Sequence, residues 1–230
     1  MVYPLKFKPT FQKRVWGGGK LRTVLGKAVE GSGWGESWEL ADLPAGTVGV
    51  DSAGASADGS LASVVSNGPW AGRSLRGLLG DERVRAEIMG SKWAESGEKP
   101  HFPLLVKFLD ARADLSVQVH PDTAYAATHP GAAVKNEAWY LVEAAPGAKI
   151  YKGVKPGAAR EIFRNALDQS EGVAELLNAV PVRAGDCYYL PSGTVHALGA
   201  GILVAEVQTP SDATFRVFDW NRLGADVKPR

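Results

Sequence analysis

The sequence contains a single cysteine, Cys187, so no disulfide can form within the chain. It also contains no apolar run near the roughly 20 residues that a membrane-spanning helix needs. The opening stretch, MVYPLKFKPTFQKRVWGGG, lacks the apolar core of a secretory signal peptide. Together these absences predict a protein of the cytoplasm that does not work in a membrane.

The chain also carries little net charge. Its 26 lysines and arginines are balanced by 25 aspartates and glutamates, which leaves a formal charge of +1. Proteins that bind nucleic acid or an anionic membrane through their overall charge usually have a clear excess of basic residues. We therefore expect neither partner, while the composition leaves the oligomeric state open.

Turn-forming residues, in contrast, are abundant. The 27 glycines and 14 prolines are spread along the whole chain, which is typical of many short elements joined by turns. Between the turns, the residue pattern often has the period of two that strands show. The strands expected from this pattern cover residues 104–109, 115–120, 138–142, 187–190 and 202–207.

Two blocks of the chain have helical spacing instead. In 74–92, with a break near Gly80, and in 157–180, apolar residues recur three and four positions apart. We expect one or two short helices in the first block and two in the second, and a surface loop at 52–68. The whole pattern predicts a mainly β protein, a jelly-roll barrel with helical insertions, formed as one domain over residues 1–230.

A polar face on one predicted strand is the first indication of a binding site. In LSVQVHPD, the side chains of Ser116, Gln118 and His120 should share one face, because alternate residues of a strand point the same way. The leucine and valines between them should face an apolar layer. Buried polar groups need partners, and a metal ion inside a barrel would provide one.

Two further residues could complete such a metal site. Glu137 stands at the head of the strand in KNEAWYLVEA, and His196 follows a tight turn in LPSGTVHALG. With Gln118 and His120 they offer one carboxylate, two imidazoles and an amide oxygen, a ligand set that suits a divalent ion and zinc above all. The residues alone leave the alternative open that each is an ordinary polar residue at a strand end.

Four longer motifs carry a family resemblance. They are RVWGG near the start, LSVQVHPD, KNEAWYLVEA and the run PVRAGDCYYLPSGTVHALGAGILVAEVQTPSDATFRVFDW. In this order they resemble the type I mannose-6-phosphate isomerases of the cupin superfamily, particularly the shorter bacterial form, from about Lys8 to Asp219. The resemblance implies a cupin, or double-stranded β-helix, barrel.

The same resemblance implies the metal and its ligands. The family's zinc-binding glutamine and first histidine match Gln118 and His120, and its glutamate and second histidine match Glu137 and His196. One zinc ion per chain is therefore expected.

Other positions match residues around the family's substrate. Arg216 matches the active-site arginine, and Asp212 the aspartate four residues before it. Lys135 matches a lysine that lines the same pocket, and Ser116 a serine near the substrate phosphate. The implied substrate is a small phosphorylated sugar.

The implied reaction converts mannose-6-phosphate to fructose-6-phosphate and back through an enediol. A proton must leave a weakly acidic carbon while negative charge develops on oxygen, so a bound zinc ion and fixed cations should lower the barrier. Arg216 and Lys135 could supply the positive charge, and Lys135 or Asp212 could carry the proton.

Two alternatives belong to other function classes. An iron-dependent cupin oxygenase usually has two histidines in an H-x-H pair, whereas this chain has Gln118 and His120 there. A non-catalytic, metal-containing sugar-binding cupin would not need Lys135, Asp212 and Arg216. Family members usually continue past the DWNR segment into further strands, so we expect either a compact form without that C-terminal extension or an incomplete chain.

Overall fold

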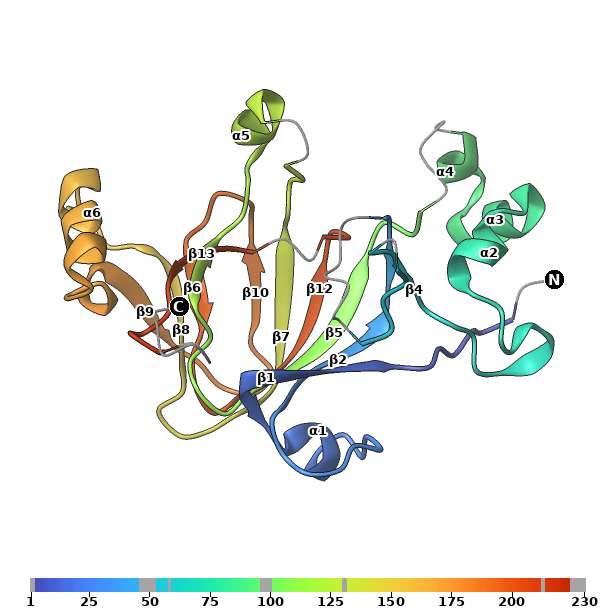
Figure 1. Cartoon of the computed structure of the whole chain (residues 1–230), viewed down its shortest axis with the longest axis horizontal. Coiled ribbons are helices and arrows are strands. Elements are labelled where there is room, and N and C mark those ends of the chain that lie inside the picture. Colours follow the sequence, from blue (N-terminus) through green and yellow to red (C-terminus); the bar gives the residue numbers. More distant parts are fainter. Residues whose placement is uncertain are drawn as a thin grey trace.

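Two antiparallel β-sheets that face each other form the centre of the molecule (Figure 1). The computed structural model describes residues 3–45, 53–57, 59–95, 101–129, 132–211 and 214–223. The larger sheet has the strand order β1 (Thr10–Gly18), β2 (Trp34–Leu40), β5 (Leu105–Ala111), β12 (Ile202–Gln208), β7 (Glu137–Ala144) and β10 (Cys187–Leu190). The smaller sheet has the order β13 (Phe215–Phe218), β6 (Val117–Val119), β11 (His196–Leu198), β8 (Lys149–Val154) and β9 (Leu177–Pro181).

The core lies between these sheets. Leu109, Leu141 and Val204 of the larger sheet pack with Ile150 and Leu198 of the smaller one, and all five are buried. Burying apolar side chains from both sheets is the main stabilising contribution to such a barrel. The arrangement confirms the predicted mainly β, cupin-type jelly roll.

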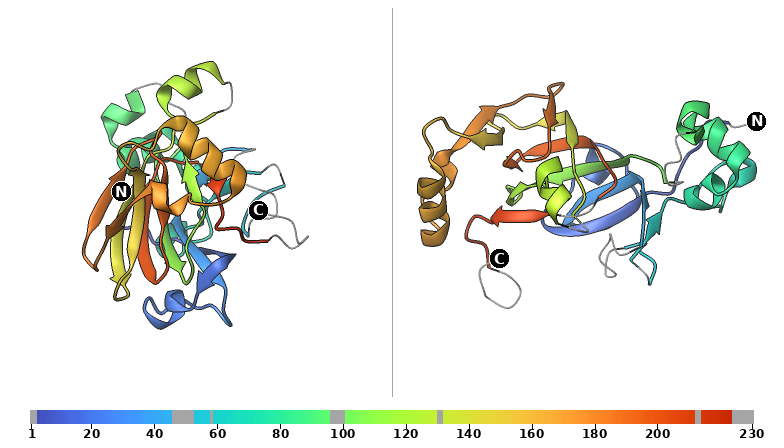
Figure 2. Two further views of the ribbon diagram at one scale, coloured as in Figure 1. Left: turned by 90° about the vertical axis from the view of Figure 1, so that its left-hand side faces the viewer. Right: turned by 90° about the horizontal axis from the view of Figure 1, so that it is seen from above.

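Short helices cover the outer faces of the barrel and extend from one end (Figure 2). Helix α1 (Lys20–Thr23) buries Leu21 against the larger sheet, and α6 (Arg160–Gln169) packs Phe163 against the smaller sheet. A separate group follows the small hairpin of β3 (Asp42–Leu43) and β4 (Leu61–Ala62). It consists of the 3-10 turn η1 (Gly68–Trp70) and helices α2 (Leu75–Leu79), α3 (Glu82–Met89) and α4 (Ser91–Glu95). This group confirms the first predicted insertion, including its break at Gly80.

The second predicted insertion holds less helix than expected. Helix α6 ends at Ser170, whose φ of 55° is left-handed, and the next helical residues are only the 3-10 turn η2 (Ala174–Leu176). The chain then enters β9, where Leu177 is buried against the smaller sheet. A helix-like spacing of apolar residues here reflects two different burial contacts, not a second α-helix.

Three smaller expectations also need correction. Leu61 and Val65, in the stretch expected to be a surface loop, are buried, and Leu61 belongs to β4. Cys187 begins the edge strand β10 and is exposed, although a cysteine within a strand would usually be buried. Residues Thr123–Thr128, for which no helix was expected, form α5. Among the described residues, no helix has the length and apolarity required to cross a membrane.

Candidate metal centre and active site

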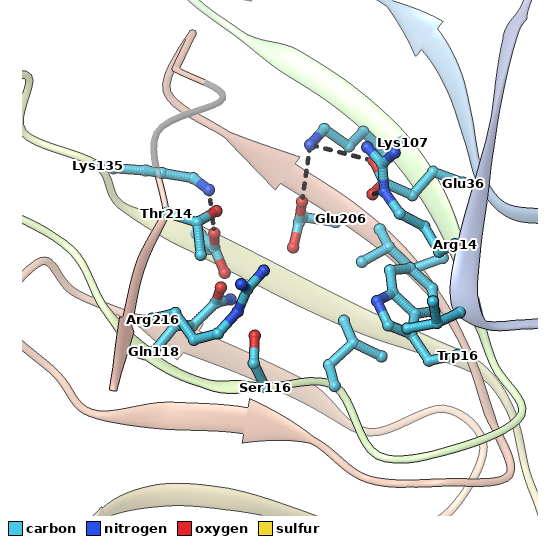
Figure 3. A pocket seen from close by; sticks show the side chains of 14 residues that line it. Arg14, Trp16, Glu36, Lys107, Ser116, Gln118, Lys135, Glu206, Thr214 and Arg216 are labelled. Carbon is cyan, nitrogen blue, oxygen red and sulfur yellow. Dashed lines mark hydrogen bonds and ion pairs between the residues drawn. The ribbon is translucent and has the colours of Figure 1, made fainter. Parts of the chain in front are cut away.

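A cavity of about 290 Å³ opens between the two sheets (Figure 3). Its polar and charged lining consists of Arg14, Glu36, Lys107, Ser116, Gln118, Lys135, Glu137, Glu206, Thr214 and Arg216. The volume is close to the lower end of the range of about 300–1,000 Å³ for small-molecule sites. The cavity therefore suits a small polar ligand.

Three buried residues at one side of the cavity form a group that can hold a metal ion. The ligand atoms of His120, Glu137 and His196 all lie within 4.8 Å of one another. Glu137 comes from the first position of β7 in the larger sheet, whereas His196 begins β11 and His120 follows β6 in the smaller sheet. The barrel thus brings together three residues that the sequence predicted would meet.

The hydrogen bonding of the two histidines fits a metal site. His196 Nδ1 lies 2.8 Å from the backbone oxygen of Thr194, which can only accept, so Nδ1 carries the proton and Nε2 is left as a ligand atom. Burial lowers the pKa of His120, helped by the nearby Lys135 ammonium and opposed by Glu137. His120 is therefore shifted toward the neutral form that binds metals, and His196 presents Nε2 as its ligand atom.

Glu137 is held as a carboxylate. Burial by itself raises the pKa of Glu137, but Lys135, His120 and His196 outweigh that effect and hold the pKa well below its usual range. Its Oε1 atom accepts from Lys135 Nζ at 2.9 Å and lies 2.9 Å from His120 Nε2. Its buried Oε2 has no hydrogen-bond partner among the described residues and lies 3.4 Å from His196 Nε2. A buried anionic oxygen without a hydrogen bond is what a metal ion would satisfy.

Gln118 lies beside this group, on the strand next to that of His196. Gln118 and His196 are directly paired across β6 and β11, and Gln118 Nε2 lies 3.2 Å from His196 Nε2. A rotation of the amide would present its oxygen to an ion held by the other three residues. All four residues predicted as metal ligands are thus gathered at one place.

The residues predicted to act on the substrate lie around this group, with one outside the described part of the chain. Ser116, Lys135 and Arg216 line the cavity and point into it (Figure 3). Arg216 is placed by its pairing on β13 with Gln118 on β6. Asp212 lies outside the described residues.

A second polar cluster, which the sequence reasoning missed, lines the cavity on the larger sheet. Lys107 of β5 stands between two acidic residues, 3.6 Å from Glu36 Oε2 of β2 and 4.0 Å from Glu206 Oε1 of β12. All three are buried. Two indole N–H groups donate to the carboxylates, Trp38 to Glu36 at 2.6 Å and Trp139 to Glu206 at 2.8 Å.

The two carboxyl groups of this cluster differ in their acidity. Burial raises the pKa of Glu36, but Lys107, Arg14 and the Trp38 N–H outweigh it and lower the pKa to about 2. For Glu206, burial and the negative charge of Glu137 together raise the pKa to about 7, although Lys107 opposes them. One carboxylate is therefore permanently ionised, and the other can exchange a proton near neutral pH.

The signal that could have found this cluster is the one that identified Gln118. Lys107 interrupts the apolar run LLVKFLD, and Glu206 interrupts ILVAEVQ. A charged residue at a buried strand position needs a partner and marks a site when it faces a cavity. Which partners these residues meet depends on the strand register, which the sequence does not show.

The two remaining histidines, His101 and His129, lie outside the cavity. His101 Nδ1 is 3.7 Å from Asp42 Oδ2, and the His129 ring stacks on Tyr125 with ring centroids 3.8 Å apart. Trp16 lies on the cavity wall.

The arrangement can hold a divalent cation, place fixed positive charge beside a polar ligand and transfer a proton near neutral pH. His120, Glu137 and His196 could hold the cation, Lys135 and Arg216 supply the fixed positive charge, and Glu206 could transfer the proton. These are the requirements for moving a proton next to a carbonyl group.

A family model matches more than half of the chain. The model described as "Phosphomannose isomerase type I, catalytic domain" matches residues 5–144. Among curated proteins, a mannose-6-phosphate isomerase of Streptococcus mutans is 38% identical over 96% of this chain and 62% of its own length. One of Bacillus subtilis is 39% identical over 99% of this chain and 64% of its own length. The chain therefore spans less than two thirds of the length of these relatives.

Solved structures agree with the barrel. The crystal structure of a mannose 6-phosphate isomerase from Bacillus subtilis superposes with a TM-score of 0.80 at 33% identity, over 100% of this chain and 65% of that one. A zinc-bound mannose 6-phosphate isomerase superposes with a TM-score of 0.61 at 19% identity, over 93% of this chain and 70% of that one. At that identity the second likeness concerns the fold alone.

Proposed function

Because the chain belongs to the type I phosphomannose isomerase family, we propose that it interconverts mannose-6-phosphate and fructose-6-phosphate. The observation that carries the proposal is the meeting of His120, Glu137 and His196, with Gln118 beside them, behind a polar cavity that Gln118 and Glu137 line. The full-length relatives that bear this activity are longer than this chain, so the activity needs a direct test.

One zinc ion per chain, held by Gln118, His120, Glu137 and His196, is part of the proposal. Two atoms that face each other at 3.4 Å support it: the buried Oε2 of Glu137, which has no hydrogen bond among the described residues, and the Nε2 of His196, whose Nδ1 carries the proton. When bound, zinc would act as a Lewis acid that orients the sugar oxygens and stabilises negative charge on them. A neutral amide in the ligand set leaves that Lewis acidity high and favours this role over the oxygen chemistry of an iron-dependent oxygenase.

Glu206 is the residue we propose to move the carbon-bound proton. Its carboxylate takes the proton from C2 of the aldose, which gives the enediol, and returns it to C1, while a second proton passes from O2 to O1. In the metal-free chain, burial first and the charge of Glu137 second raise the pKa of Glu206 to about 7, which suits a group that takes up and releases a proton. Lys135, named as a candidate base from the sequence, is already paired with Glu137 at 2.9 Å, so a fixed cationic role suits it better.

Lys135 and Arg216 supply positive charge to the developing enediolate and to the substrate phosphate. Both line the cavity, Lys135 buried and Arg216 exposed at its mouth. Such fixed charges stabilise the transition state because they need no reorganisation as the negative charge forms. Ser116, next to Gln118 on the same face, is placed to donate a hydrogen bond to the phosphate.

The substrate and location follow the same proposal. A small phosphorylated sugar fits the size of the cavity and the cations Lys135 and Arg216 in its lining, and we propose the cytoplasm as its place of action. The single cysteine, which is free and exposed, supports a reducing compartment.

The test is a coupled assay for fructose-6-phosphate formed from mannose-6-phosphate by the zinc-loaded chain. Replacing Arg216 by Ala should reduce kcat by on the order of 10²-fold, because a charge that stabilises the transition state is lost. The zinc content, measured by plasma emission spectroscopy, should stay at that of the unmodified protein. Arg183→Ala, which removes an arginine whose side chain is 89% exposed outside the cavity, is the matched control and should keep full activity.

Two results would count against the proposal. An unmodified, zinc-loaded chain that forms no product from a panel of phosphorylated and free aldoses would favour a non-catalytic sugar-binding cupin. Equal loss of activity and zinc in Arg216→Ala would remove Arg216 from the transition state and make it a structural support of the metal.

A further inference from the structure

A continuous row of contacts links the rim of the cavity to the proposed proton carrier. Arg14 Nε donates to Glu36 Oε1 at 2.6 Å, Glu36 Oε2 lies 3.6 Å from Lys107 Nζ, and Lys107 Nζ lies 4.0 Å from Glu206 Oε1 (Figure 3). Three of the four side chains are buried, and only that of Arg14 is partly exposed, at 30%. The row begins in the RVWGG motif, for which the proposed chemistry has given no role.

The sheet register places the inner part of this row. Trp38 pairs with Lys107, Lys107 with Glu206, and Glu206 with Trp139, so four neighbouring strands each contribute one side chain to the same line across the inner face. Directly opposed residues on one face of a sheet are its closest side-chain neighbours. Lys107 also lies over the Trp38 ring, with its Nζ 4.6 Å from the ring centre.

Arg14 reaches the row because β1 leaves β2 at this point. Trp34 pairs both with Lys13 and with Gly18, so the residues between them bulge away from β2 and over the cavity. Gly35 makes room for this bulge, since a Cβ there would stand 2.6 Å from Arg14 Cβ and 2.8 Å from the Trp16 ring. The local fold thus provides a place for the Arg14 side chain directly beside Glu36.

We propose that Arg14 is a positioning residue of the isomerisation, which acts through Glu36 and Lys107 on Glu206. The inference rests on the proposed function for its kinetic part and on geometry alone for its structural part. Arg14 itself need not touch the substrate.

The physical reason lies in how the oxygens of Glu36 are shared. Arg14 occupies Oε1, so only Oε2 is left for the Trp38 N–H and for Lys107. The ammonium of Lys107 lies between the two carboxylates, 3.6 Å from Glu36 and 4.0 Å from Glu206, and interacts with both. Without Arg14, Glu36 would attract the Lys107 ammonium more strongly. A small movement of this ammonium toward Glu36 would increase its distance from Glu206.

The experiment compares Arg14→Met with Arg14→Lys and with the control Lys13→Met in the zinc-loaded, full chain. Lys13 is the neighbouring exposed cation, which lies over Trp34 at 5.0 Å and outside the row. We expect kcat to fall at least about tenfold in Arg14→Met with KM nearly unchanged, because a small displacement of a reacting group costs rate more than binding. Arg14→Lys should recover part of kcat, and Lys13→Met all of it.

A second readout needs no activity. The indole N–H signals of Trp38 and Trp139 in a ¹H–¹⁵N spectrum report the two carboxylates, since each indole donates to one of them. Both signals should move in Arg14→Met, and neither should move in Lys13→Met. Assignment by Trp38→Phe and Trp139→Phe identifies the peaks.

The outcomes separate this inference from the proposed function. Movement of the Trp38 signal alone would show that the effect of Arg14 ends at Glu36 and would overturn the inference. So would an unchanged kcat, or a loss confined to KM, which would make Arg14 a substrate-binding residue. If the unmodified chain were inactive, the proposed function would be wrong. The Trp139 signal would still show whether the effect of Arg14 reaches Glu206. Should Arg14→Met fail to fold, Arg14→Lys carries the same test with a smaller expected shift.

Discussion

Charged residues that interrupt apolar strands line the candidate site of this protein. Lys107 and Glu206 each stand at a buried position where an aliphatic residue would contribute more to stability. Each is retained beside a partner of opposite charge and faces the cavity. Their cost to stability is therefore measurable, and Glu206 offers the clearest case.

Glu206→Gln should remove a pH dependence from the stability of the metal-free protein. The folded state raises the pKa of Glu206 from 4.5 to about 7, through burial and the charge of Glu137, and so favours the protonated form. The folded state then binds more protons than the unfolded state between these pH values, and wild-type stability falls as pH rises from about 4.5 to 7. A neutral glutamine has no such proton to lose. Above pH 7 the variant should be more stable than wild type by a few kcal/mol.

Urea unfolding at pH 5 and pH 8 measures this difference. The exposed Glu171 provides a control, because Glu171→Gln should follow wild type at both values. Parallel pH dependence in wild type and Glu206→Gln would mean that Glu206 is ionised throughout the range and would remove the basis for its proton-transfer role.

At the scale of elements, the candidate site depends on the register in which short strands pair. Gln118 pairs with His196 on one side and with Arg216 on the other, so β6 alone aligns a metal ligand of β11 with a cation of β13. Helix α6 covers the outer face behind β6, where Phe163 packs in the cluster that holds Val117. The C-terminal end of α6 therefore affects the packing behind the site and leaves the side chains of the site unchanged.

Ser170→Gly should stabilise the protein by about 0.5–1 kcal/mol. Ser170 caps α6 with φ at 55°, a left-handed conformation that costs an L-residue energy and glycine almost none. Its contact with Asn221 uses the backbone oxygen, which the substitution keeps. The midpoint of urea unfolding measures the gain, with kcat unchanged. Ser170→Ala retains a Cβ and should give no gain; an equal gain in both variants would contradict the backbone explanation.

At the scale of the whole molecule, the metal group joins the two sheets. Glu137 belongs to the larger sheet, whereas Gln118 and His196 belong to the smaller one. An ion bound by all of them would cross-link the barrel in the folded state only. We also propose that residues 1–230 form a single domain. The cross-link should therefore stabilise the whole chain, which would unfold in one cooperative transition.

Zinc should therefore raise the thermal midpoint of the whole chain. At a free zinc concentration 100 times Kd, binding to the folded state adds about 2.7 kcal/mol. Calorimetric scans with zinc and with a chelator measure the shift, in a Cys187→Ser background because the exposed thiol could bind zinc by itself. Glu137→Gln should lose the shift. If that variant kept the full zinc response, the ion would be bound elsewhere.

The sequence by itself determined the mainly β class, several of the elements and one side of the site. Alternation around Gln118 and His120 predicted their shared face, because the direction of a strand side chain follows from its position alone. The motifs also identified Glu137, His196 and the cations near them. Helical spacing located α2 and α3, since local burial on one side produces that pattern.

Only the tertiary structure decided which distant residues became neighbours. Glu36, Lys107 and Glu206 lie on separate strands far apart in the chain, and the register of β2, β5 and β12 alone places them side by side. The same holds for the bulge that brings Arg14 to Glu36. Strand pairing is a long-range choice among many registers of similar local preference, so its consequences become visible only in the folded barrel.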